Sequence, residues 1–259
     1  VGEADAGIGA RLATLLTSEQ IIAAMYRGNR AERLVALEAA AHLSNPWPVL
    51  PFLAAFLGAE ERGAASQAAA SLLAALDTLA ARPAPAGEVV PGQTAQLVRS
   101  LFAVAENDVY ALDLRVSALV AIRTLGEISR TAQAPPQALL ESTEFPIASA
   151  SMALLSPPLN DAALSTLATI AESSNEPLLR GQATGLLCEN ALFHRVAKPS
   201  DDLAALIRGV FDAKLPGAAL LPALACLCRF PPEAQSGLVD LALAHPDPAV
   251  KRFWDASSR

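Results

Sequence analysis

The chain has 259 residues, which is enough for one or two compact domains or for one elongated domain. Hydrophobic residues make up 53% and charged residues 17%, a balance that excludes an intrinsically disordered chain. The net charge of −7 disfavours a nucleic-acid partner, because binding to phosphates needs clustered Lys and Arg, and Lys is rare and scattered here.

The composition predicts an all-α fold. Ala and Leu supply most of the apolar share, and both are good helix formers. Aromatic residues make up only 5%, and the β-branched residues that sheets favour are scarce. No apolar run reaches the ~20 residues of a membrane-spanning helix, and no signal-peptide pattern is visible. We therefore expect no membrane span, and a cytoplasmic location is the default expectation.

The cysteines are expected to be free, buried thiols in a reducing compartment. Cys188, Cys226 and Cys228 each lie in an apolar helical run, and an odd number without a regular spacing argues against a disulfide framework. Cys226 and Cys228 are two residues apart, so on a helix they point in different directions. The paired spacing of zinc ligands is also missing, so no metal site is predicted.

In chain order, a short amphipathic segment at 7–16 is followed by a series of helices separated by Pro, Gly and Asn. Ser18, Thr94, Asn175 and Ser200 are candidate N-caps. Residues 82–92 form the clearest loop, because they contain three Pro and two Gly. The helices are expected at residues 20–27, 30–43, 49–57, 60–81, 95–106, 109–130, 135–142, 146–155, 161–172, 176–196, 201–213, 216–229, 233–244 and 249–256.

The breaks recur about every 30 to 40 residues, which is the spacing of helical-repeat proteins. This spacing predicts an α-solenoid of about seven antiparallel helix pairs that occupies residues 1–259 as a single domain.

The second helices of several pairs align on a basic residue: Arg33, Arg115, Arg180 and Lys251. Apolar or small residues follow at steps of three, seven and ten, as Ala118, Ile122 and Leu125 do after Arg115. These steps keep the side chains on one face of a helix. We interpret the basic residues as structural, bonded to the preceding turn or to an acidic residue of the adjacent repeat.

This pattern resembles the HEAT-repeat family, including its bacterial short-repeat, bilin-lyase-like branch. The best match is His245-Pro-Asp-Pro-Ala-Val-Lys251, which is similar to the family's entry into the second helix. Gly28-Asn29-Arg30 and Asn175-Glu176-Pro177 lie at the corresponding turns. The resemblance implies a HEAT/armadillo-like superhelix and most often a noncatalytic scaffold that binds another protein or a peptide segment.

In such an arrangement the second helices line the concave side, so their polar residues outside the core are the candidate binding set. These residues are Glu38, His42, Arg123, Glu127, Glu189 and His194. The sparse surface charge also predicts some exposed apolar area, which favours contacts with another protein or with a second copy.

No catalytic constellation is visible. The three histidines His42, His194 and His245 lie in different repeats, and we expect each to be exposed or satisfied in the core. A phosphate-binding Gly loop and a HExxH motif are both missing, so no cofactor is predicted. Two alternatives to a scaffold stay open: an enzyme on a HEAT-like frame, similar to DNA glycosylases or bilin lyases, and a structural module of a larger assembly.

Overall fold

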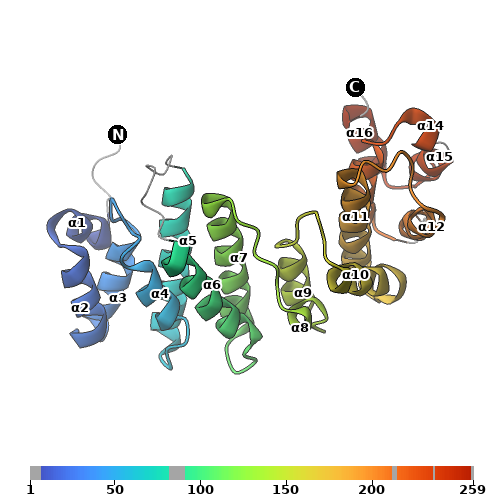
Figure 1. Ribbon diagram of the computed structural model, residues 1–259. Helices are drawn as coiled ribbons and strands as arrows, with labels where there is room; N and C mark the ends of the chain where they lie inside the picture. Colours follow the sequence, from blue (N-terminus) through green and yellow to red (C-terminus); the bar gives the residue numbers. More distant parts are fainter. Residues whose placement is uncertain (1–6, 82–90, 212–214, 236, 258–259) are drawn as a thin grey trace. The chain divides into compact units, whose positions relative to one another are not determined.

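The computed structural model describes residues 7–81, 91–211, 215–235 and 237–257. All regular structure in these ranges is helical, which confirms the all-α prediction (Figure 1). The chain divides into two compact units, residues 1–133 and 134–259, and each is described by itself. The single domain over 1–259 stays a prediction.

Unit 1 consists of two layers of helices. Helices α3, α5 and α7 lie side by side as layer B, and α1 extends this layer beyond α3 (Figure 1). Helices α2, α4 and α6 form layer A, and each packs on the layer-B helix that follows it in the chain. The helices are α1 Ile8–Leu15, α2 Ser18–Arg27, α3 Arg30–Ala40, α4 Leu50–Phe56, α5 Arg62–Ala80, α6 Pro91–Glu106 and α7 Leu112–Ser129.

Unit 2 repeats this arrangement. Helices α9, α11, α13 and α16 follow one another as its layer B, and α8, α10, α12 and α15 form its layer A. The short helix α14 lies in the connection before α15. The helices are α8 Gln137–Leu140, α9 Phe145–Met152, α10 Asp161–Ser173, α11 Pro177–Phe193, α12 Asp201–Val210, α13 Gly217–Leu227, α14 Pro232–Gln235, α15 Leu238–Leu243 and α16 Pro248–Ser257.

Polar caps fix where many of these helices begin. Thr17 and Asn29 each form a reciprocal capping box with the residue three positions later. Asn160 and Ser200 accept one backbone N–H each at the starts of α10 and α12. The cap of α2 is Thr17, one residue before the predicted Ser18, because either hydroxyl fits the capping pattern. Most of the predicted loop at 82–92 lies outside the described residues, but Pro91 and Gly92 already belong to α6.

One predicted helix is wrong. Residues 233–244 form two short helices, α14 and α15, separated around Gly237. Gly237 has a φ of 78°, in the left-handed region that an α-helix does not continue through. The apolar periodicity of this segment therefore belongs to a short helix that starts later than expected.

The closest packing in unit 2 is between α11 and α13. A Cβ added to Gly181 would overlap the backbone carbonyl of Ala219, and one added to Gly185 would lie 2.7 Å from Cβ of Pro222. Cys188, one turn further on α11, meets Cys226 on α13. Because the facing positions increase together along both helices, α11 and α13 run parallel.

The facing cysteines correct a second expectation. Cys188 and Cys226 form a buried disulfide, with their Cα atoms 6.1 Å apart, so they are not free thiols. Cys228 is free, and burial raises the pKa of its thiol. Spacing within a helix carried no sign of this pair, because the two cysteines lie on different helices and are 38 residues apart in sequence.

Adding one methyl group at Gly181 should therefore be costly. In Gly181→Ala the new Cβ meets backbone rather than a flexible side chain, so we expect unfolding free energy to fall by about 1–3 kcal/mol. Gly63→Ala is the matched control, because its nearest neighbour lies 3.9 Å away and Ala favours helix. Denaturant unfolding measures both. Equal or higher stability of Gly181→Ala would contradict the close approach.

A titration of free thiols tests the disulfide. Protein purified without reductant and then denatured should react with one equivalent of a thiol reagent, at Cys228, and with three after reduction. Three equivalents before reduction would show that Cys188 and Cys226 are unpaired.

Candidate functional site

The aligned basic residues tie each layer-B helix to the end of the helix before it. Nε of Arg33, at the start of α3, donates to the carbonyl oxygen of Met25 at 3.1 Å. Arg115 makes the same bond to Ala105 at 2.9 Å, and Arg180 makes it to Ala171 at 3.2 Å. The accepting carbonyls belong to the last turns of α2, α6 and α10, which lack partners within their own helices. A cation there also interacts favourably with the helix dipole.

Arg33 in addition contacts the next helix pair. Its Nη1 lies 3.2 Å from Oε2 of Glu61, the residue that precedes α5, and Nε of Arg30 lies 2.6 Å from Oε1. The structural interpretation of Arg33 predicts an acidic partner in the adjacent helix pair, and Glu61 is that partner. Lys251, the fourth aligned residue, is exposed on α16. That these positions mark HEAT repeats stays a prediction.

The predicted binding residues fall in both units. Arg123 and Glu127 are exposed on α7 and form an ion pair at 3.1 Å. Glu189 is exposed on α11, and His194 is exposed at the end of that helix, with its ring edge-on to Phe193. His42 is exposed in the turn after α3.

Glu38 differs from the others because α1 covers it. Its side chain is half-buried against the first turn of α1, and a Cβ added to Gly9 would lie 2.7 Å from its Cγ. The carboxylate thus lies near the N-terminus of α1, where negative charge is favourable. Glu38 therefore has a packing role that the sequence did not indicate, because 7–16 read only as a short lead-in.

His245 is buried and fully bonded. Its Nδ1 accepts the backbone N–H of Asp247 at 3.2 Å, so the ring proton is on Nε2, which donates to the carbonyl oxygen of Leu215 at 3.0 Å. The ring joins the turn before α16 to the segment before α13. This is a structural role, as the sequence analysis expects of a single histidine in the core.

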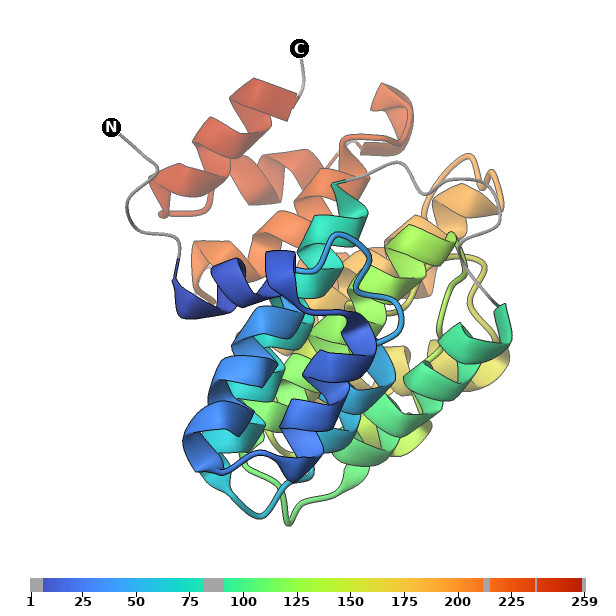
Figure 2. The same ribbon diagram turned by 90° about the vertical axis from the view of Figure 1, so that its left-hand side faces the viewer.

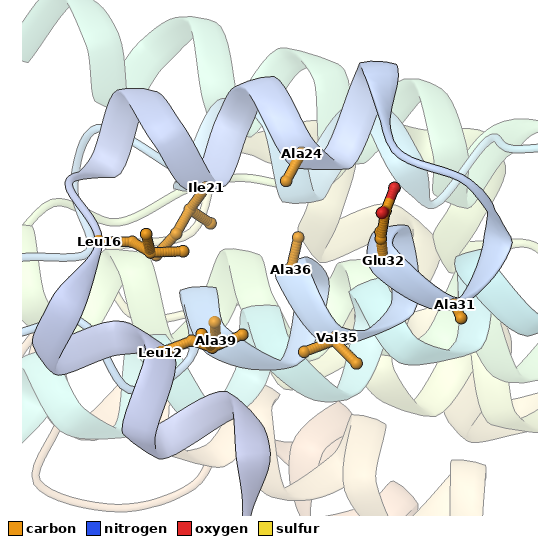
Figure 3. A pocket seen from close by; sticks show the side chains of 9 residues that line it. All are labelled: Leu12, Leu16, Ile21, Ala24, Ala31, Glu32, Val35, Ala36 and Ala39. Carbon is orange, nitrogen blue, oxygen red and sulfur yellow. The ribbon is translucent and has the colours of Figure 1, made fainter.

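An apolar groove lies between α1, α2 and α3, and no pattern in the sequence predicts it. It has a volume of about 320 Å³. Figure 3 shows Leu12 and Leu16 at one end, Ala24 beside Ala36 in the middle, and the carboxylate of Glu32 at the other end. Ile21, Ala31, Val35 and Ala39 complete the lining. Small Ala side chains on both walls leave this space unfilled.

A smaller hollow in unit 2 is more polar. It has a volume of about 180 Å³ and lies beside α8 and α10, where Gln137, Asn160 and Thr166 contribute to its lining. Asn160 is already used as the cap of α10, and Gln137 bonds to Glu141 at 2.6 Å. The side chains of Asn160 and Gln137 are thus engaged in local hydrogen bonds of the fold.

The described ranges contain no group of three or more His, Cys, Asp or Glu side chains placed to share a metal ion. Within the same ranges, no helix combines the length and the hydropathy that crossing a membrane requires. No protein-family model matches the chain, and neither a curated protein nor a solved structure matches it.

The role of the Arg–carbonyl bond is tested on α7, which carries one buried and one exposed arginine. Arg115→Met removes the donor to Ala105 and leaves a buried carbonyl unsatisfied, so we expect unfolding free energy to fall by about 1–3 kcal/mol. Arg123→Met is the control on the same helix, where the ion pair is exposed and the change should stay within about 0.5 kcal/mol. Equal effects in thermal or denaturant unfolding would remove the structural interpretation of Arg115.

Proposed function

We propose that the chain is a HEAT-like α-solenoid that binds another protein or a peptide segment through layer B. The observation that carries the proposal is the shared plan of the two units, in which successive layer-B helices contact one another. A layer of this kind is covered by layer A on one side, so its other side is available over several consecutive helices. Extended surfaces of this type are the binding surfaces of solenoid proteins.

The polar side chains available on layer B support this assignment. Arg123, Glu127 and Glu189 are exposed on α7 and α11 and have no part in the packing between helices. We place Glu38 outside the binding set because α1 covers it. His42 and His194 stay in the proposed set as exposed residues at the ends of layer-B helices.

The composition favours a protein partner over DNA. A glycosylase-like enzyme needs a basic surface to neutralise phosphates, whereas the chain carries a net charge of −7. A cytoplasmic location stays a default prediction. The reducing compartment expected from free thiols is not supported by Cys188 and Cys226, since these two are paired.

A charge-reversal experiment tests the binding surface. The layer-B variant carries Arg123→Glu, Glu127→Lys and Glu189→Lys. The matched layer-A variant carries Arg208→Glu, Glu19→Lys and Glu172→Lys, which are also exposed positions and give the same change in net charge. Each protein serves as bait for affinity capture from the native organism, followed by quantitative mass spectrometry. We expect a partner to be lost by about tenfold or more from the layer-B variant and kept by the layer-A variant.

Equal capture by all three proteins, with unchanged thermal stability, would contradict binding through layer B. Loss only from the layer-A variant would place the binding surface on the opposite layer and would contradict the proposal as well.

A further inference from the structure

The apolar groove lies at the end of unit 1 where layer B extends one helix further than layer A. Elsewhere in the units, layer-A helices contact the next helix of their layer, as α4 contacts α6 and α10 contacts α12. At the N-terminal end, α1 continues layer B beyond α3, but no helix of the described part of unit 1 continues layer A beyond α2. Figure 2 shows α1 and α2 at this end, in front of α3. The groove is the space that a further layer-A helix would cover.

The side chains that other layer-A helices bury against layer B indicate what kind of helix would fit this groove. Helix α12 buries Leu203, Ile207 and Val210, which are four and three residues apart, against neighbouring helices that include α11 and α13. The occupant of the groove should therefore be a helix with bulky aliphatic residues about one or two turns apart. The carboxylate of Glu32 at one end adds a preference for a cation. One oxygen already accepts the Asn29 N–H at 2.8 Å, and a carboxylate can accept further bonds.

Helix α1 carries a face of this kind and leaves it uncovered. Ile8 is 67% and Leu15 is 77% exposed, and seven residues, or about two turns, separate them on the same side of the helix. The exposed Arg11 lies between them on that side. Two large exposed aliphatic side chains and one guanidinium match the apolar walls and the carboxylate of the groove that α1 borders.

We propose that the chain forms a twofold-symmetric dimer in which α1 of each copy lies in the α1–α3 groove of the other. Arg11 of one copy pairs with Glu32 of its partner, and Ile8 and Leu15 cover the alanine-lined walls. Because the groove and the exposed face of α1 lie at the same end of unit 1, one symmetric contact buries both surfaces twice. This self-association involves a different surface from the layer-B binding set and goes beyond the proposed function.

Sedimentation across a wide range of protein concentration tests the dimer. We expect the wild type to shift from monomer to dimer, and Leu15→Glu to raise the dissociation constant by more than about tenfold. Leu15 is so exposed in the single copy that the substitution leaves the fold unaffected. Val109→Glu is the matched control, since Val109 is 84% exposed in a turn of unit 1 away from the groove.

The ion pair is tested by a double-mutant cycle. Glu32→Gln removes the charge but keeps an acceptor for the Asn29 N–H, because Gln also serves in a capping box. We expect Glu32→Gln and Arg11→Gln each to weaken the dimer, the double variant to weaken it no further than either alone, and high salt to reduce the difference.

A wild type that stays monomeric at all concentrations would overturn the dimer, as would a dimer that Leu15→Glu leaves unchanged. Additive effects of the two charge variants would overturn the pairing of Arg11 with Glu32, and the proposed contact with it. These outcomes leave layer-B binding untouched, whereas failure of the charge-reversal capture leaves the dimer untouched, so the two proposals fail separately.

Discussion

The long helices of both units bury their apolar surface between several neighbouring helices rather than against a single one. Helix α5 shows this most clearly, because its buried residues are almost all Ala and Leu and it packs against α3, α4 and α7 at once. Small side chains let three neighbours approach one helix closely. Each neighbour removes a different part of the apolar surface of that helix from water. The closest such approach on α11 is at Gly181, where the backbone of α11 packs directly on the backbone of α13 at Ala219.

The arginine side chains provide hydrogen-bond donors for backbone carbonyls that this packing buries at helix ends. Close helix pairs bury the last carbonyls of layer-A helices, which have no partner within their own helix. Arg33, Arg115 and Arg180 satisfy one such carbonyl each from the first turn of the following helix. A long side chain with a planar group of five donors can reach back across the turn and still make a second contact, as Arg33 does with Glu61. The turn is thus fixed by a bond as well as by packing.

Much of this arrangement could be predicted from local pattern, and the rest depends on contacts between distant segments. The predicted face Ala118, Ile122 and Leu125 is buried, and Ser200 caps α12 as expected, because helix periodicity and capping are local. The Cys188–Cys226 pair, the cover that α1 gives Glu38 and the groove itself each arise where remote segments meet. A single sequence holds no local sign of such meetings. The candidate binding residues were found as exposed polar positions, but their shared role stays a prediction.

The proposed α-solenoid differs from a compact fold in its overall dimensions. Small-angle X-ray scattering from the Leu15→Glu variant, measured as a monomer, tests it most directly. A compact domain of 259 residues has a radius of gyration of about 18 Å. An α-solenoid is expected to give a clearly larger value and an asymmetric distance distribution with a long tail. A value near 18 Å with a symmetric distribution would contradict it.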